Sequence, residues 1–383
     1  MTPETWLLTE GSRLQSTSEL LCRLAEFLRA TGIPIVRVWY GCFRLHPHVA
    51  GSAVTWRFGV PVEAHQLPVM NVAFSERLSV ISRAGPMRDV LGPNPVAHVP
   101  LTGDEPAEWD LNPDLRRLGC TYLVALQLFT EPLLSGTLTF ATNVPGGLTQ
   151  AQVALIVAMR PALGLVLHLL EQATVARTLL AAYLGASPAE RVLAGQIRRG
   201  LGERVPGVVW VSDLRGFTAM SETLPGEALL ETLSVAFEAQ VGGIEEAGGT
   251  VLKFMGDGVL ALFPAHGDPS VACEAALRAV RVTFVGLAAC NAAREAAGEA
   301  ALALGVGLHF GEVMYGNIGS SGRLDFTVVG PAVNRAARLE GLGATLGVEV
   351  IASAEFAAWA GEPMEELGAL GLIRFGGRVD LSS

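Results

Sequence analysis

Two aspartates in the C-terminal half each lie where an apolar, strand-like run reaches a turn. Asp257 lies between two glycines inside the apolar segment 252–263, a pattern that predicts a β-hairpin with this carboxylate at its tip. Asp213 ends the apolar run 208–212 and is soon followed by Gly216. An aspartate beside a glycine is by itself ordinary turn chemistry. Two carboxylates at two strand ends, however, are the ligands that a divalent metal ion and a triphosphate need.

The composition excludes several classes of protein. Half of the 383 residues are hydrophobic and 17% are charged, which allows large cores and excludes extensive disorder. A chain of this length is expected to form two or three domains. The net charge of −10 argues against a nucleic-acid partner, because contact with a phosphate backbone needs a basic face.

The cysteines and the apolar segments predict a cytoplasmic protein without a membrane span. The five cysteines are scattered without metal-site spacing, which favours reduced thiols. The N-terminus lacks the basic and apolar regions of a signal peptide. The most apolar run, 153–170, is short for a bilayer and is interrupted by Arg160, Pro161 and His168. We therefore expect a buried or dimer-forming helix there.

The first 172 residues have an α+β order of predicted elements. Helical periodicity and β-rich runs predict one helix and four strands, at 13–31, 35–40, 53–58, 121–129 and 136–141. This order resembles a small sensory domain of the GAF type, which implies a small-molecule or protein regulator. A long helix, kinked at Pro161, is expected from 148 to 184. The segment 173–205 is predicted to be a signalling helix and linker, in which the helix is either a core helix or a parallel coiled coil.

The C-terminal domain alternates strands and helices. The patterns predict strands or hairpins at 208–213, 250–263, 302–319, 325–329 and 348–352, and helices at 217–247, 268–297, 331–342 and 353–360. Residues 366–383 are predicted to be an irregular tail, with Arg374 and Arg378 as its cations.

Four blocks in this domain, in order, carry a family resemblance. They are Ser212–Thr218, Lys253–Gly258, Gly307–Val313 and the segment GSSGRLDFTVVGPAVNRAARLE at 319–340. With these blocks, residues 206–365 resemble the class III nucleotidyl cyclase catalytic domain. The resemblance implies a ferredoxin-like βαββαβ fold within an α+β class. It also implies cyclisation of a nucleoside triphosphate with loss of pyrophosphate.

The resemblance implies a role for each matching residue. Asp213, Asp257 and the carbonyl of Leu214 would bind two Mg²⁺ or Mn²⁺ ions. The amides of Gly216, Phe217 and Thr218, where a helix is expected to begin, would bind phosphate oxygens. Asn334 and Arg338, four apart on one helix face, would orient the ribose and stabilise the phosphorus under attack. In the family, the carboxylates and the Asn/Arg pair of one site come from two subunits, which implies a homodimer with shared active sites.

The choice of base depends on two further positions. Adenylyl cyclases of the family carry a Lys and an Asp or Thr there, and guanylyl cyclases carry Glu and Cys. This chain has Lys253 and Thr327, so the resemblance favours ATP, as in the bacterial-type branch. Two alternatives stay open: a guanylate cyclase, and a non-catalytic nucleotide-binding or dimerisation module.

Overall fold

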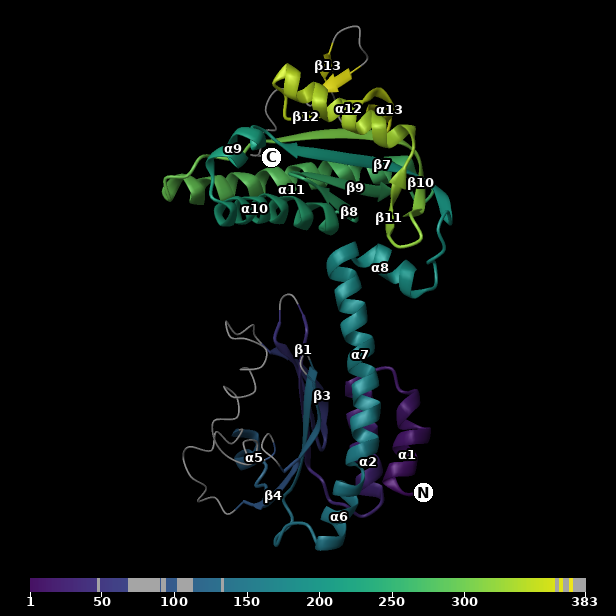
Figure 1. Cartoon of the computed structure of the whole chain (residues 1–383), viewed down its shortest axis with the longest axis vertical. Helices are drawn as coiled ribbons and strands as arrows, with labels where there is room; N and C mark the ends of the chain where they lie inside the picture. The colour runs from purple at the N-terminus through teal and green to yellow at the C-terminus, as the bar shows by residue number, and fades with distance from the viewer. Residues whose placement is uncertain are drawn as a thin grey trace. The chain divides into compact units, whose positions relative to one another are not determined.

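The computed structural model describes residues 1–46, 49–67, 90, 94–101, 113–131 and 134–361, and the backbone of 365–367 and 372–374. The chain divides into two compact units, Met1–Leu179 and Leu180–Ser383. Arg378 lies outside the described residues, and the side chain of Arg374 is likewise not described. Each unit contains both helices and a β-sheet, so the predicted α+β class is confirmed for the described part of the chain (Figure 1).

The first unit is built on an antiparallel sheet. Within the described residues this sheet has six strands in the order β3-β2-β1-β6-β5-β4. They are β1 (Arg37–Arg44), β2 (Gly51–Arg57), β3 (Val60–Leu67), β4 (Val96–Pro100), β5 (Tyr122–Glu131) and β6 (Leu134–Thr142). The four predicted strands are β1, β2, β5 and β6. Strands β3 and β4 were not predicted, because both are largely exposed and contain polar residues and proline, which break the apolar pattern of a strand.

Helices cover this sheet unequally. They are α1 (Pro3–Thr9), the 3₁₀ turn Gly11–Arg13, α2 (Thr17–Ala30), α5 (Pro113–Arg117), α6 (Gln150–Ala158) and α7 (Arg160–Leu184). Figure 1 shows α2 and α7 on one face of the sheet and α5 on the other. Leu24 of α2 and Leu167 of α7 are fully buried against Tyr40 and Phe140 of the sheet. The helix is interrupted at Met159 rather than kinked at Pro161, because proline is tolerated in the first turn of α7, where no backbone N–H is required.

The segment that contains α6 and α7 is the most apolar helical stretch of the described chain. Gln150–Leu184 is long and apolar enough to cross a membrane by length and composition alone. Leu163, Val166 and Leu167 are nevertheless buried in the core of the first unit. The apolar side chains on that side of α7 therefore have packing partners within the chain.

The second unit contains a mixed sheet in the order β13-β14-β12-β10-β7-β9-β8, and β11 pairs with β10. Its strands are β7 (Gly202–Leu214), β8 (Thr250–Met255), β9 (Gly258–Pro264), β10 (Leu304–Gly319), β11 (Leu324–Val329), β12 (Val350–Ser353), β13 (Glu365–Leu367) and β14 (Leu372–Arg374). Its helices are α8 (Ala186–Leu193), α9 (Phe217–Thr223), α10 (Gly226–Glu246), α11 (Pro269–Ala296), α12 (Pro331–Leu346) and α13 (Ala354–Ala357).

Strand β7 is the central strand of this unit and is buried on both faces. Val208 and Trp210 pack in the core that contains α11, whereas Val209 and Val211 pack in the core that contains α12. The alternation follows from the two-residue period of a strand. It places Asp213, two residues after Val211, on the α12 face at the end of β7.

Three predictions for this unit were wrong. The helix predicted at 217–247 is two helices, α9 and α10, because Leu224 and Pro225 between them have an extended backbone. Residues 302–319 do not form a hairpin, because 304–319 is one strand of 16 residues whose antiparallel partners are β7 and β11. At the glycines of β10, other parts of the chain come close to the strand; these glycines do not form a turn. The tail is not wholly irregular either, because the backbone of β14 pairs with β12 and with β13.

A substitution at Gly307 tests whether α12 packs directly against the backbone of β10. A Cβ atom there would lie 2.3 Å from the carbonyl oxygen of Ala336 and 2.6 Å from the backbone nitrogen of Glu340, both in α12. We expect Gly307→Ala to push α12 off the sheet and to lower the free energy of unfolding by about 3 kcal/mol, measured by urea denaturation. Gly341→Ala is the matched control, since a Cβ there meets nothing within 4 Å and should stabilise α12 slightly. Equal stability of Gly307→Ala and wild type would contradict the close packing.

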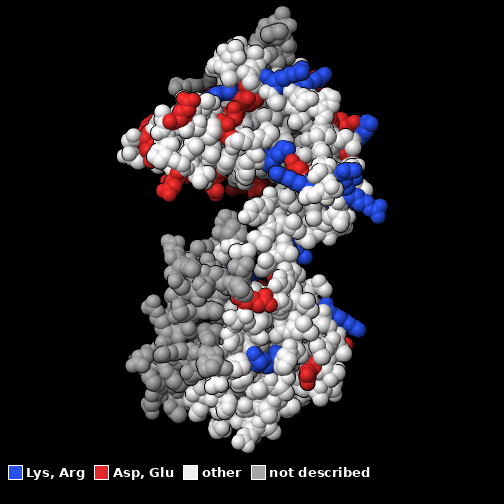
Figure 2. All heavy atoms as spheres, in the orientation of Figure 1, with Lys and Arg blue, Asp and Glu red and all other residues white. Residues whose placement is uncertain are grey.

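Acidic residues mark the outer side of α10. The helix exposes five glutamates and contains no lysine or arginine: Glu227, Glu231, Glu238, Glu245 and Glu246. Figure 2 shows acidic side chains over this part of the second unit. Such a surface repels a phosphate backbone.

Candidate active site

The two aspartates lie together at one end of the second sheet. Asp213 is at the end of β7, and Asp257 is in the turn between β8 and β9, where the predicted hairpin is confirmed. Gly256 has φ = 66°, the left-handed conformation that this turn requires. A Cβ atom on Gly258 would lie 2.4 Å from the carbonyl oxygen of Ser212 and 3.3 Å from Oδ1 of Asp213. The glycine therefore lets the turn approach the end of β7 closely enough to bring the carboxylates together.

The proximity of the two carboxylates has an electrostatic consequence. Burial, and then the charge and hydrogen bonding of Asp257, raise the pKa of Asp213 to about 6. Glu340 raises this pKa further, and Arg215 opposes the rise. Because the neighbouring carboxylate opposes the ionisation of Asp213, binding a cation or a proton relieves the negative charge of this site.

The donor atoms at this position fit a hard divalent cation. Mg²⁺ and Mn²⁺ prefer oxygen ligands, and Mg²⁺ commonly takes one or two carboxylates and completes its shell with water and substrate phosphates. Asp213 and Asp257 supply two carboxylates, and Leu214 follows directly with a backbone carbonyl. No cluster of three or more His, Cys, Asp or Glu suited to a metal occurs among the described residues. The site therefore fits an ion that arrives with a phosphate ligand better than a protein-only cage.

An ion pair that the sequence did not predict supports this site. The Arg215 guanidinium donates to Oε1 of Glu340 at 2.6 Å, and both side chains are largely buried. It joins the end of β7 to α12. A Cβ atom on Gly305 would lie 1.9 Å from Nη2 of Arg215, so the pair lies across β10 where that strand has no side chain. Arg215 lies within the motif block Ser212–Thr218, but no role was predicted for it.

Removing this ion pair is expected to strengthen cation binding. Arg215→Ala leaves Glu340 unpaired beside Asp213 and removes a positive charge that offsets the negative charge of the site. We expect about 1–3 kcal/mol of destabilisation and about a tenfold lower Mn²⁺ concentration for half-maximal activity. Metal titration of the activity measures the second effect. Arg204→Ala, which breaks the exposed pair with Glu312, is the control, and equal metal dependence in both variants would refute the coupling.

Asn334 and Arg338 lie on the solvent side of α12. Both are exposed, and neither side chain has a hydrogen-bond or ion-pair partner within the described residues. The chain therefore does not connect them to Asp213 or Asp257. Pro331 is the first residue of the helix, a position that suits proline. The arrangement leaves the Asn/Arg pair available to a group outside this chain.

Lys253 on β8 and Thr327 on β11 lie on strands that contact each other without pairing in the sheet, and the two side chains have different surroundings. The ammonium of Lys253 on β8 donates to Oδ2 of Asp325 on β11 at 3.0 Å. Asp325 was missed by the sequence analysis, although it shares a strand face with Thr327 two residues on. Thr327 is buried, and its Oγ1 has no hydrogen-bond partner among the residues that the structure describes. A buried hydroxyl without a partner is costly unless a ligand satisfies it.

The predicted phosphate-binding turn begins a helix, as expected. Helix α9 starts at Phe217, and Gly216 before it has φ = 73°. A non-glycine residue rarely adopts this conformation. Gly216 and Thr218 are exposed, so their amides lie at the surface next to the end of β7.

Comparison with known proteins agrees with this geometry. The model of the adenylate and guanylate cyclase catalytic domain matches residues 207–360. An adenylate cyclase of Anabaena cylindrica is 34% identical over 143 residues, which cover 36% of this chain and 28% of that protein. Adenylate cyclase 1 of Rhizobium meliloti is 31% identical over 167 residues, which cover 44% of this chain and 25% of that protein. The match thus spans about a quarter of the length of these relatives.

Among solved structures, the guanylyl cyclase Cya2 is 30% identical, with a TM-score of 0.40, over 47% of this chain and 97% of that one. The family match includes both aspartates, Lys253, Thr327 and the helix that carries Asn334 and Arg338. Residues 207–360 of this chain therefore belong to the adenylate and guanylate cyclase catalytic domain family, the class III nucleotidyl cyclases.

Proposed function

We propose that this protein is an adenylate cyclase, which converts ATP to 3′,5′-cyclic AMP and pyrophosphate. The observation that carries the proposal is the close pair of carboxylates, Asp213 and Asp257, in a domain of the cyclase family. The reaction is an in-line attack of the ribose 3′-hydroxyl on the α-phosphorus. Catalysis of such a step is mostly positioning and charge stabilisation.

The residues of the site divide this task. Asp213, Asp257 and the carbonyl of Leu214 hold divalent metal ions against the triphosphate, and the amides of 216–218 donate to phosphate oxygens. When bound, two such ions supply charge stabilisation and lower the pKa of the attacking hydroxyl. Because the pKa of Asp213 is raised in the free site, the ionised pair gains from meeting a cation.

Asn334 and Arg338 act on the ribose and on the phosphorus under attack. A guanidinium suits this role because its charge is permanent and its donors are forked. Both residues are exposed and have no partner in the described part of their own chain, which supports a homodimer in which they complete the site of the other subunit. Exposed apolar side chains on β8 and β11 provide further surface for such contact: Phe254, Met255, Leu324 and Val329.

ATP is the substrate we propose because of Lys253 and Thr327. Asp325 accepts a hydrogen bond from the ammonium of Lys253. The hydroxyl of Thr327 has no partner within the described residues, and the edge of an adenine would supply one. A guanylate cyclase remains the alternative. Competition between ATP and GTP in a cyclisation assay separates the two, since the preferred nucleotide inhibits turnover of the other.

Exchanging these two residues is expected to change the base preference. In the double variant Lys253→Glu/Thr327→Cys, we expect the ratio of kcat/KM for ATP over GTP to fall by about 100-fold or more, because buried polar groups then mismatch the adenine edge. Initial rates with each nucleotide measure this ratio. Arg204→Ala is again the control. An unchanged ratio would show that other residues read the base.

The proposed activity has a direct test. Purified full-length protein is incubated with Mn²⁺ and ATP, and both cyclic AMP and pyrophosphate are quantified. Equal amounts of the two products support the enzyme. ATP binding without either product, from protein verified as dimeric, would overturn the proposal in favour of a nucleotide-binding or dimerisation module.

We further propose a regulatory role for the first unit and a cytoplasmic location. An antiparallel sheet with α2 and α7 on one face supports a GAF-like sensory domain. The strand order β10-β7-β9-β8 supports the ferredoxin-like βαββαβ assignment for the second unit. Helix α7 begins in the first unit and continues past Leu179, so it is the element we propose as the signalling helix. The five free thiols support a reducing compartment.

A further inference from the structure

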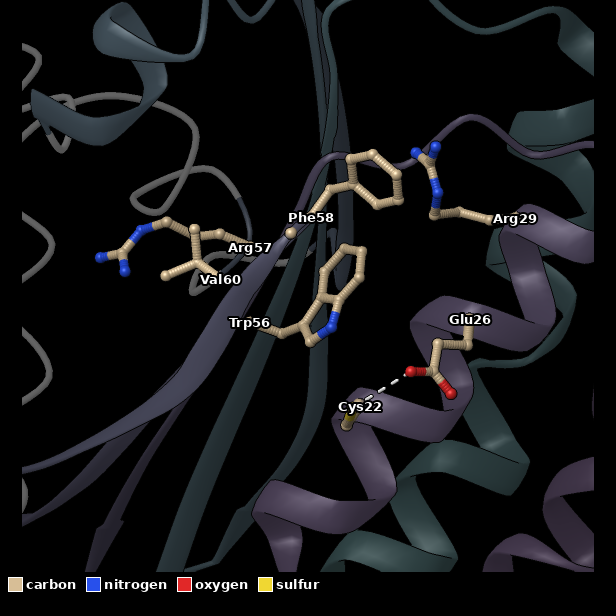
Figure 3. A pocket seen from close by; sticks show the side chains of 8 residues that line it. Cys22, Glu26, Arg29, Trp56, Arg57, Phe58 and Val60 are labelled. Atoms are coloured by element: carbon tan, nitrogen blue, oxygen red, sulfur yellow. Dashed lines mark hydrogen bonds between the residues drawn. The ribbon is translucent and has the colours of Figure 1, made fainter.

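A cleft in the first unit opens between α2 and the end of β2. Its volume is about 440 Å³, a size that suits a small molecule. Helix α2 lines one side with Cys22, Glu26 and Arg29, which follow one another at helical spacing. Trp56 and Phe58 face them from the end of β2 and the turn after it (Figure 3). The cleft therefore has polar groups on its helix side and aromatic rings on its strand side.

The two rings give the strand side an apolar surface of defined shape. Trp56 is 5% exposed and belongs to the hydrophobic core, whereas Phe58 is 57% exposed at the rim. Their ring centroids lie 6.5 Å apart and the ring planes are tilted by 59°, so the rings present two differently oriented surfaces. Such surfaces favour burial of an apolar group, and above all of another aromatic ring.

The Arg29 guanidinium is fixed at the rim by two contacts. Nη1 donates to the carbonyl oxygen of Ile35 at 2.6 Å, and Cζ lies 3.6 Å from the ring centre of Phe58. A guanidinium has five N–H donors in one plane, and the bond to Ile35 uses one of them. Because the side chain is already ordered, a carboxylate can bind the remaining donors without a further loss of side-chain entropy.

Glu26 places a carboxylate one helical turn before Arg29. Its Oε1 accepts a hydrogen bond from the thiol of Cys22 at 3.6 Å. Burial, and then the charge of Glu26, raise the pKa of Cys22, so the thiol stays protonated and acts as the donor. No described ion pair joins Glu26 to Arg29, since Glu26 turns to Cys22 and Arg29 turns to Ile35 and Phe58 (Figure 3).

The charges that face the cleft are therefore one carboxylate and one guanidinium, both from α2. Arg57 also borders the cleft, but its side chain points away from α2, and its guanidinium binds Asp114 and Glu63 (Figure 3). A simple anion or a simple cation would be attracted by one of the two groups and repelled by the other. A zwitterion is attracted by both.

We propose that this cleft binds a free α-amino acid with an aromatic side chain. The carboxylate of the amino acid lies on Arg29, its ammonium on Glu26, and its ring against Trp56 and Phe58. An α-amino acid carries both charges close together beside one side chain, which matches two opposite charges one helical turn apart that face a pair of rings. The inference rests on the contacts of the first unit and does not depend on the cyclase reaction.

The test titrates full-length protein with L-phenylalanine by isothermal calorimetry, without nucleotide. Two matched probes each lack one charge: 3-phenylpropanoate has no ammonium, and 2-phenylethylamine has no carboxylate. We expect each to bind at least about tenfold more weakly than phenylalanine, because each loses a charge-assisted hydrogen bond. Hydrogen–deuterium exchange should show protection by phenylalanine in peptides of α2 and of the β2–β3 turn. Absence of binding, equal affinity for the three probes, or protection confined to other segments would overturn the proposal.

Two variants assign the charges of the ligand to the residues of the cleft. In Glu26→Gln, phenylalanine should bind no more tightly than 3-phenylpropanoate, and in Arg29→Gln no more tightly than 2-phenylethylamine. Glu26→Gln should keep the unfolding midpoint, because its amide oxygen can still accept from Cys22. Glu19→Gln and Arg23→Met, which alter an exposed ion pair on the same helix, are the controls and should keep all three affinities. If Glu26→Gln or Arg29→Gln weakens the three probes alike, the residue has a structural role and the proposal is wrong.

Discussion

Asp257→Asn is expected to reduce cyclisation at least about 1,000-fold without lowering the stability of the protein. The substitution removes one of the two charged metal ligands but keeps the size of the side chain. It also removes a charge that raises the pKa of Asp213, so that pKa falls toward its ordinary value. A group with a raised pKa in the folded state opposes folding at neutral pH. The loss of function should therefore accompany an equal or higher unfolding midpoint.

Two measurements on the same preparations check this result. Cyclic AMP formation with Mn²⁺ and ATP gives the activity, and thermal unfolding gives the midpoint. Glu246→Gln on α10 is the control, since it removes one exposed negative charge from a helix that carries none of the proposed site residues. If the Asp257→Asn protein loses activity only because it unfolds, the result would contradict the proposed role of Asp257 as a metal ligand.

Mixing two inactive variants is expected to restore activity. Arg338→Ala alone should lower kcat about 1,000-fold, because the guanidinium stabilises charge on the reacting phosphorus. When Asp257→Asn and Arg338→Ala protomers are mixed in equal amounts, random pairing makes half of the dimers mixed. Each mixed dimer has one site with both residues intact, so the mixture should reach about one quarter of wild-type activity.

A second mixture controls for this experiment. Asp213→Asn and Asp257→Asn remove groups from the same side of the site, so their mixed dimers contain no intact site and should stay inactive. Recovery in this control, or none in the first mixture, would contradict active sites shared between subunits.

Much of the second unit could be predicted from local pattern. The hairpin around Asp257 follows from a turn of glycines between two apolar strands, and residues 250–264 form it. Helix α11 was predicted within one residue at each end, and the structure shows that the side chain of Asp268 caps its start, with proline at the next position. The site residues themselves came from four motif blocks, and their roles stay predictions.

Residue pairs distant in sequence were decided by the tertiary structure alone. Arg215 meets Glu340 across 125 positions, and Lys253 meets Asp325 across 72. No periodicity in a single sequence encodes such partners, because the contact depends on which strands and helices become neighbours. The glycines of β10 were misread for the same reason, since local pattern cannot distinguish a turn from a place where α12 must approach the backbone.

The sequence by itself determined the strand ends that carry Asp213 and Asp257, because alternation and turn residues act over a few positions. Only the tertiary structure decided that these two carboxylates share one end of the sheet, on the face where α12 packs. The same holds for the cleft of the first unit. Glu26 and Arg29 read as ordinary helix charges, and they face Trp56 and Phe58 only because α2 packs beside β2.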